Sequence, residues 1–296
     1  MIDLDDIAKE IREIINKKQK ELEISFIENT HTYFIKDSKG KIRSDYPSVS
    51  GLIDHFYLPF DDKAKSLQMC NGDVDKQKIL LAEWKAKGDF ATNMGSRAHY
   101  ELELEVIRRY GNYKSVREPE FIVNDEQINK SNNMILAGKK FLDLMINERK
   151  AVLLDTETTM GSNTLKYFGT PDKLWLALNK NKDGILLYCS DWKTNKPENF
   201  IPKSYHGMMY PPFDDYYATT LQHYYVQLPL YIRLLFDMLK GSKYENLKLG
   251  GCIVVLLKDD KTYQEYRVPQ IFIDNLLTMD LKPYIKTKKK EEKLYD

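Results

Sequence analysis

The chain has 296 residues, enough to bury one large core or one core with a small lobe beside it. Its net charge is +1, so it lacks the overall excess of positive charge that marks many nucleic-acid binders, although a local field in a cleft can still attract an anion. The three cysteines form no Cys-x-x-Cys pair, which argues against zinc and iron–sulfur sites. No apolar run reaches the roughly 18–20 residues that span a bilayer, and no signal peptide is recognisable, so we expect a cytoplasmic protein without a membrane partner.

The amino-terminal part is expected to form helices and a β-hairpin. Isoleucines recur at helical spacing over residues 7–15. The alternating stretch "HTYFI" at 31–35, followed by the turn "DSKGK" and a return stretch, predicts the hairpin. Ser48 is placed to cap a short helix over 49–56, and the polar segment 61–90 is expected to be helical and to end in "EWKAKG".

Two longer helices are predicted next. In "GSRAHYELELEVIRRYG", Ser96 is a plausible amino-terminal cap and Gly111 a plausible residue just past the end. His99 lies on an otherwise apolar stripe of this helix. The segment 125–149 has the pattern of a further helix.

The remainder alternates strands and helices. A helix is expected over 219–239, where Pro229 should bend it or mark a helix start, and a last helix begins near Pro269. The expected strands cover 151–160, 164–170, 172–179, 184–194, 250–259 and 263–268. This order predicts an α/β (α+β) fold with a central mixed β-sheet flanked by helices.

The stretch "DWKT" at the end of a predicted strand suggests chemistry. Asp191 and Lys193 are two residues apart, so their side chains point to the same face. If the hairpin loop is 179–184, Asp172 on the partner strand lies opposite Asp191; a tighter turn at Asp183 and Gly184 would shift the register by a residue or two. Two carboxylates facing each other repel, and a cation bound between them makes the net interaction attractive. Hard oxygen ligands favour Mg²⁺ or Mn²⁺.

Further candidates lie upstream. Leu153, Asp155 and Glu157 should share one strand face, which makes Glu157 the candidate third acid and Asp155 the alternative. His99 would bring an imidazole to the same cleft, where Lys193 stabilises charge on a phosphate or orients a water. Each feature alone also has an ordinary structural interpretation: a strand end emerging into solvent, a core histidine with its hydrogen bonds satisfied, a turn entering a strand.

Five motifs occur together in one order. They are "YPSVSGLI" (46–53), "GSRAHYELE" (95–103), "GTPDKLWL" (169–176), "DWKT" (191–194) and "QLPLY" (227–231). In this order the chain, from about residue 31 to 240, resembles the PD-(D/E)XK nuclease superfamily, in particular its RecB-like and phage-exonuclease branch. The resemblance implies a restriction-endonuclease-like core. Residues 1–296 would form one nuclease domain, with a helical and hairpin lobe over 1–90 and the catalytic core over 91–296.

The resemblance also implies roles for individual residues. The metal ligands would be His99, Asp172, Asp191 and the backbone carbonyl of Trp192. The catalytic residues would be Asp172, Asp191, Lys193 and, at a less constant spacing, Glu157. The substrate-binding residues would be Gln227, Tyr231, Ser96, Arg97 and Thr194. Pro229 departs from the usual Gln-x-x-x-Tyr helix and puts the role of Tyr231 in doubt.

The implied activity is that of a Mg²⁺- or Mn²⁺-dependent DNA exonuclease. It would hydrolyse phosphodiester bonds from the ends of linear DNA in recombination or repair, in a bacterial or phage-infected cell, with a single-strand annealing or other recombination protein as a candidate partner. The alternatives are a structure-specific or defence-related endonuclease and a catalytically inactive nucleic-acid-binding member. The Tyr-rich loop "PKSYHGMMYPP" (202–212) is interpreted either as part of a strand channel or as a packed surface loop. The sequence specifies no oligomeric state.

Overall fold

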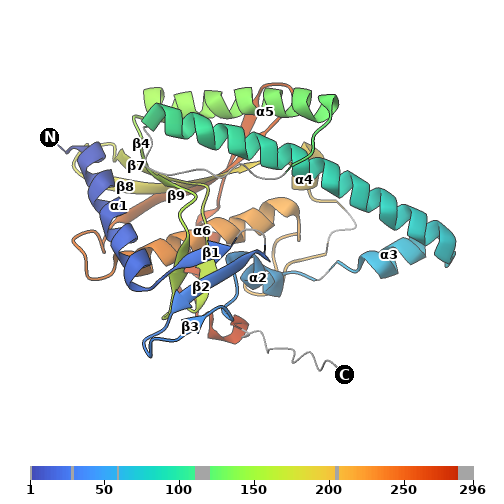
Figure 1. Ribbon diagram of the computed structural model, residues 1–296, viewed down its shortest axis with the longest axis horizontal. Coiled ribbons are helices and arrows are strands. Elements are labelled where there is room, and N and C mark those ends of the chain that lie inside the picture. Colours follow the sequence, from blue (N-terminus) through green and yellow to red (C-terminus); the bar gives the residue numbers. More distant parts are fainter. Residues whose placement is uncertain (1, 28–29, 59, 111–120, 204–206, 286–296) are drawn as a thin grey trace.

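The computed structural model describes residues 2–27, 30–58, 60–110, 121–203 and 207–285 (Figure 1). Its centre is a five-stranded sheet in the order β10-β9-β8-β7-β4. β8 and β9 are parallel, whereas the other neighbouring pairs are antiparallel, so the sheet is mixed, as the order of predicted elements indicated. The strands are β4 (Val152–Thr156), β7 (Lys173–Leu178), β8 (Ile185–Lys193), β9 (Lys248–Leu257) and β10 (Tyr263–Arg267).

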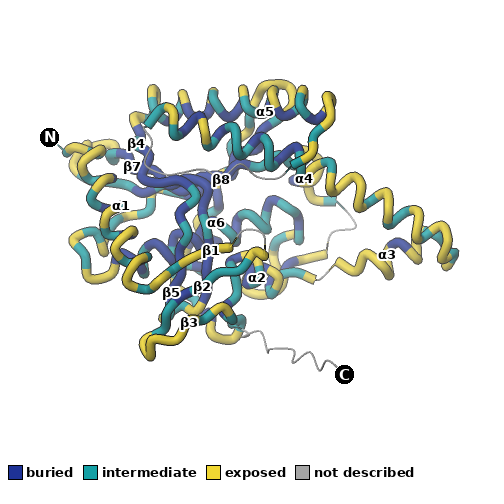
Figure 2. The backbone as a smooth tube through the Cα atoms, in the orientation of Figure 1, coloured by how far each residue is buried: buried dark blue, intermediate teal, exposed yellow. Residues whose placement is uncertain are grey.

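Helices flank the sheet on both faces (Figure 1). One face packs against α4 (Val74–Tyr110) and α5 (Asp125–Asp143), and its core includes Trp175 and Trp192. The other face packs against α1 (Leu4–Glu21), α6 (Thr220–Leu239) and α7 (Gln270–Thr278), with Leu174 and Cys189 in its core. Because both faces are covered, the other four strands are buried along most of their length, whereas the residues of the edge strand β10 are half-buried or exposed (Figure 2).

Smaller elements lie beside this core. The predicted hairpin is present as β2 (Thr32–Lys36) and β3 (Ile42–Arg43), with β1 (Ser25–Ile27) added at its edge. Ser48 caps α2 (Val49–Ile53), as expected, by accepting a hydrogen bond from the Gly51 N–H at 3.2 Å. The remaining elements are α3 (Asp62–Met69), the hairpin β5 (Met160–Ser162) and β6 (Tyr167–Gly169), a π-helical turn (Leu144–Glu148) and 3₁₀ turns at Asp54–Phe56, Pro197–Phe200 and Lys282–Tyr284.

The predicted break between two helices near residue 95 is wrong. α4 is one helix of 37 residues that passes through residue 90 without interruption, so Ser96 lies inside it and is not a cap. A glycine in a helix interior costs only about 1 kcal/mol, which tertiary packing outweighs. At Gly95 the packing is visible, because a Cβ there would lie 2.8 Å from Thr194 Oγ1. Gly111 lies outside the described residues. The amino-terminal part of α4 extends away from the sheet together with α3 (Figures 1 and 2).

The expected alternation along 151–160 is also wrong. Leu153 pairs with Trp175 but Asp155 pairs with Leu174, so a β-bulge lies between them. Since Trp175 and Leu174 face opposite sides, Leu153 and Asp155 do so as well. β4 ends at Thr156, and Glu157 has a left-handed backbone with φ 47°. The acid therefore leaves the strand in a turn instead of continuing the strand face.

Pro229 neither starts nor ends a helix. α6 begins at Thr220, one residue past the expected start, and continues through Pro229 to Leu239. Proline removes one backbone donor from the helical ladder, and the buried apolar residues on either side compensate for the loss. Within the part of the chain that the structure describes, no helix is long and apolar enough to cross a membrane.

Candidate active site

The candidate residues meet where β7 begins and β8 ends. Lys173 pairs with Ser190, which is the register expected for a loop at 179–184, and the next pair outward brings Asp172 opposite Asp191. Trp192 is fully buried under α4 and α5. Asp191 and Lys193 therefore point to the opposite face of the strand, toward α6.

Asp172 joins three elements at this point. Its Oδ2 accepts a hydrogen bond from the Trp192 N–H at 2.9 Å and lies 3.6 Å from Nδ1 of His99, which α4 supplies. Its backbone carbonyl accepts from the hydroxyl of Thr156 at 2.9 Å and from the N–H of Glu157 at 3.1 Å. The imidazole of His99 also hydrogen-bonds to the Trp192 backbone. The structure thus brings His99, Asp172 and Trp192 together, from positions far apart in the chain.

Asp191 and Lys193 form an ion pair inside the protein. The Asp191 side chain is 2% exposed, and the ammonium of Lys193 lies against its Oδ2. Burial and the neighbouring Asp172 carboxylate raise the pKa of Asp191 to about 7, even though Lys193 opposes this change. The two carboxylates raise the pKa of Lys193 above its ordinary value against the effect of burial, so this lysine stays charged.

The two facing aspartates differ in protonation. Burial acts to raise the pKa of Asp172, but His99 and Lys193 outweigh it and hold this pKa below its usual value. Asp172 therefore carries the negative charge, and Asp191 is the carboxyl that holds a proton more readily.

Glu157 and His99 complete the cluster. Burial raises the pKa of Glu157 well above its usual value, and the Asp172 carboxylate raises it further. Burial lowers the pKa of His99 although Asp172 opposes this, which favours the neutral imidazole that can act as a ligand. Asp155, the alternative third acid, follows the bulge and accepts a hydrogen bond from the Thr158 hydroxyl at 2.6 Å.

Two residues at the site were not predicted. The Tyr224 ring lies 4.4 Å from Nζ of Lys193, and its hydroxyl donates to Asn195 Oδ1 at 2.8 Å. Lys173 is fully buried, with its Nζ 4.1 Å from the ring of Trp192 and 3.2 Å from the Asp172 carbonyl. Tyr224 precedes Gln227 by one helical turn, and this spacing on α6 was the available signal. Nothing in the strand pattern distinguished Lys173.

The Gln-x-x-x-Tyr motif lies on α6 beside this cluster. Gln227 Nε2 donates to the Tyr231 hydroxyl at 2.7 Å, and Asp191 contributes to the raised pKa of buried Tyr231. The Tyr231 ring packs so closely on Gly169 that a Cβ there would lie 2.6 Å from it, which accounts for the glycine ahead of Asp172. The Oε1 of Gln227 is buried without a hydrogen-bond partner among the described residues.

The other candidate substrate-binding residues do not all lie in the same place. Thr194 follows Lys193 directly and touches α4 at Gly95. Ser96 is half-buried on the adjoining turn of α4. Arg97 is not brought to the cluster, because its guanidinium donates to the Ser131 hydroxyl at 2.6 Å and to the Ile128 carbonyl at 3.4 Å. It ties α4 to α5.

The donor chemistry of the cluster suits a hard divalent cation. Carboxylate oxygens, one imidazole and the unsatisfied Oε1 of Gln227 are ligand types compatible with Mg²⁺ or Mn²⁺. A cation would also offset the repulsion among the buried acids. The described residues nevertheless contain no group of three or more His, Cys, Asp or Glu side chains already arranged to hold a metal ion. The chemistry fits, but the coordination geometry is not preassembled.

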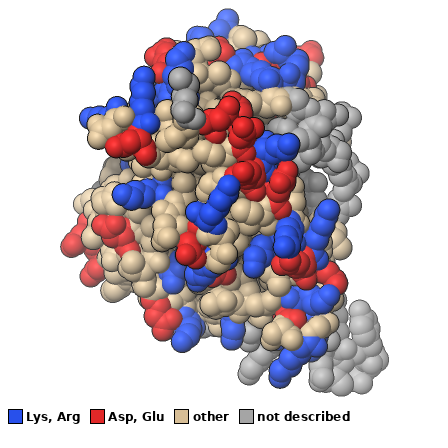
Figure 3. Space-filling view, turned by 90° about the vertical axis from the view of Figure 1, so that its left-hand side faces the viewer, with Lys and Arg blue, Asp and Glu red and all other residues tan. Residues whose placement is uncertain are grey.

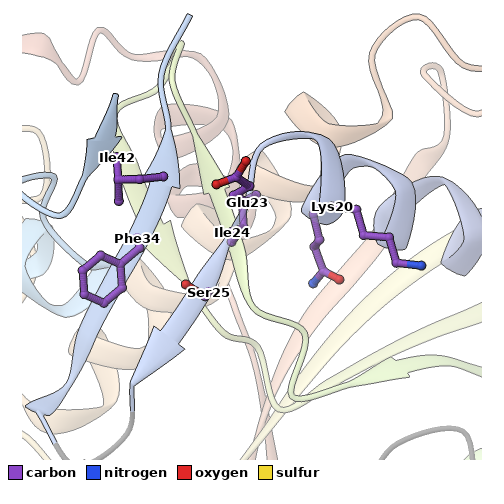
Figure 4. Close-up of a pocket in the computed structure, with 7 residues that line it drawn as sticks. Lys20, Glu23, Ile24, Ser25, Phe34 and Ile42 are labelled. Atoms are coloured by element: carbon purple, nitrogen blue, oxygen red, sulfur yellow. The ribbon is translucent and has the colours of Figure 1, made fainter. Parts of the chain in front are cut away.

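Elsewhere, an open hollow of about 640 Å³ lies between the end of α1 and the strands β1–β3 (Figure 4). Lys20, Glu23, Phe34 and Ile42 line it together with Gln19, Ile24 and Ser25, and none of these is a candidate site residue. The neighbouring face of the molecule carries acidic and basic side chains interspersed (Figure 3). A scan of protein-family models finds no match to this sequence, and a search of curated proteins also finds none.

Proposed function

We propose that the protein is a Mg²⁺- or Mn²⁺-dependent deoxyribonuclease with a restriction-endonuclease-like PD-(D/E)XK core, which removes nucleotides from the ends of linear DNA. The observation that carries this proposal is the meeting of Asp172, Asp191, Lys193 and His99 at one strand end, from three separate sequence motifs. The motif order alone suggested these residues, and their proximity is an independent observation that supports it.

In the proposed reaction, Asp172, Asp191 and His99 would hold the cation, with the Trp192 carbonyl beside them. The bound cation would supply a more acidic water and neutralise charge on the scissile phosphate. Lys193 places a fixed positive charge beside that phosphate, and the Tyr224 ring limits where its ammonium can lie. Trp192, packed on the opposite face, holds the strand end in place. Glu157, with its raised pKa, can hold a proton beside the two aspartates.

The test is digestion of end-labelled linear duplex, linear single-stranded and circular DNA with Mg²⁺ or Mn²⁺. Wild-type protein should degrade linear DNA, and Asp191→Ala and Lys193→Ala should abolish this while the protein stays folded. Asp75→Ala and Lys180→Ala are matched controls, because Asp75 is 91% exposed on α4 and Lys180 is exposed in the loop at the other end of β8. Full activity in either site variant contradicts the assignment. Cleavage of circular DNA would instead favour the structure-specific or defence-related endonuclease.

One observation favours a second candidate, a catalytically inactive member that only binds nucleic acid. Lys193 already neutralises the Asp191 oxygen that a cation would need. Metal titration by calorimetry separates the two: a folded protein that takes up neither Mg²⁺ nor Mn²⁺ would favour the inactive member. Uptake that Asp191→Ala removes would favour the nuclease.

A further inference from the structure

A groove of about 820 Å³ lies beside the candidate site. Its walls come from α4, from the start of α5, from the segment that follows β8 and from the end of β9. Of the residues that line it, the motifs assign a role only to Thr194, and the proposed reaction uses none of them. Its volume is in the range of pockets that hold small organic ligands, about 300–1,000 Å³.

The groove approaches the candidate active site at Thr194 and Asn195. Thr194 and Asn195, which line it, are the next residues after Lys193. Met94, on the opposite wall, precedes His99 by five positions on the same helix. Asn195 also accepts the hydrogen bond from Tyr224, whose ring lies against Lys193. A chain-like ligand that leaves the site past Asn195, outside the contact of Thr194 with Gly95, would reach this groove.

The floor of the groove is apolar and contains an aromatic ring. Phe90 is half-buried there, and Met94, Met134 and Leu257 lie around it. Nζ of Lys130 lies 5.7 Å from the Phe90 ring centroid, so a cation adjoins the aromatic surface. A flat, weakly polar ring that carries a nearby negative charge matches this surface, and nucleotide bases linked by phosphates have those properties.

Lysines border the groove. Among the described residues, Lys87, Lys196 and Lys258 form no ion pair, whereas Lys130 pairs with Glu126 at 2.7 Å. Glu83, Asp259 and Asp260 also line the groove, so its net charge is only slightly positive and cannot by itself select an anion. The position of Lys196 matters more than the net charge of the groove, because Lys196 lies three residues beyond Lys193 on the segment that leaves the site. It can contact a phosphate that follows the one at the catalytic lysine.

We propose that this groove binds a short single-stranded DNA segment that adjoins the scissile phosphate, with a base stacked on Phe90 and a phosphate held by Lys196. This inference rests on the proposed function for the direction in which the strand runs, but binding can be measured without cleavage. The groove would then explain how one strand of a DNA end is kept at the site between successive cuts.

The experiment measures binding of a fluorescein-labelled oligothymidylate to the full chain in EDTA, by fluorescence anisotropy at several salt concentrations. Phe90→Ala should weaken binding about fivefold to a hundredfold, the usual effect of losing one stacked base. Lys196→Ala should reduce the slope of log K against log salt by about 0.7, the value for one phosphate contact on a single strand. The matched controls are Phe60→Ala, an aromatic 73% exposed outside the groove, and Lys180→Ala. Thermal unfolding checks that Phe90→Ala is folded, and the exposed Lys196 provides a variant that does not disturb packing.

The outcomes separate this inference from the proposed function. Weaker binding in both groove variants, with unchanged controls, supports the groove even if the wild-type protein hydrolyses nothing. Wild-type affinity in both variants, an equal loss in the controls, or no binding of oligothymidylate by the wild-type protein overturns it. If DNA is hydrolysed with Mn²⁺ while the groove variants bind and cut like wild type, the nuclease assignment stands and the groove has another role.

Discussion

Buried acids lie at two places beside α4, and their pKa values are shifted in opposite directions. Glu105 is 6% exposed and contacts Arg108, Arg109 and Lys139. Burial acts to raise its pKa, but these three cations lower the pKa to about 2. Near His99 on the same helix, burial and Asp172 raise the pKa of Asp191 to about 7.

The difference comes from the local balance of charge. Three cations surround one carboxylate at Glu105, so the charged form is stabilised and the cluster ties α4 to α5. At the strand end, Asp172, Asp191 and Glu157 share the ammonium of Lys193 and the nearby Lys173, and at least one acid is driven toward its neutral form. Burial of an acid is thus no guide to function by itself. The excess of acids over cations at the strand end is what supports the proposed cation site.

The most direct test of this comparison is to neutralise one acid in the cluster of Asp172, Asp191 and Glu157. If the proposed function holds, Asp191→Asn should lower kcat/KM for DNA hydrolysis about a thousandfold, because it removes the charge of a proposed ligand while keeping the side-chain shape. That loss corresponds to about 4 kcal/mol of transition-state stabilisation. Steady-state kinetics with Mg²⁺ measures it, and thermal unfolding should remain near wild type. An active Asp191→Asn protein would remove the distinction between the clusters.

A second prediction concerns the cation itself. Mg²⁺ or Mn²⁺ at about 100 times its Kd should stabilise the fold by about 2.7 kcal/mol, seen as a higher Tm. Because the pKa of Asp191 is about 7, ionisation of this ligand is incomplete below that pH and cation binding must release a proton. Affinity should therefore fall about tenfold between pH 8 and pH 6. Calorimetry in two buffers of different ionisation enthalpy counts the proton, and equal affinity at both pH values would contradict the assignment.

Loss of the Glu105 charge should lower the stability of the protein and leave its activity unchanged. Glu105→Gln should lower the free energy of unfolding by roughly 2 kcal/mol, a value reduced for the exposure of Arg108. The folded pKa of Glu105, about 2, is below its unfolded value of 4.5, so this stabilisation is complete above about pH 4.5 and is lost as the pH falls toward 2. Urea unfolding of both proteins at pH 7 and pH 3 measures the difference. A constant difference across that range would show that the charge is not responsible.

The smallest expected effect is at Tyr224. Tyr224→Leu should reduce kcat/KM about fivefold to tenfold, because the ring that limits the position of the Lys193 ammonium is lost. Tyr224→Phe keeps the ring, loses only the hydrogen bond to Asn195, and should retain most of the activity. If both variants lose activity equally, the hydroxyl and not the ring is the important group.

Local geometry followed from the sequence wherever spacing along one element determines it. The two-residue period of a strand placed Asp191 and Lys193 on one face, and the hairpin loop at 179–184 gave the register that sets Asp172 opposite Asp191. The mixed sheet followed from the order of strands and helices.

Contacts between distant segments required the tertiary structure. The bulge after Leu153 reversed the face of Asp155, because strand pairing and not local propensity sets it. α4 continues through Gly95, where a Cβ would collide with Thr194, and Arg97 bonds to α5 instead of joining the cluster. The sequence by itself therefore determined which residues could carry the chemistry. The tertiary structure decided the balance of charge around each buried acid, because that balance depends on through-space distances between residues far apart in the chain.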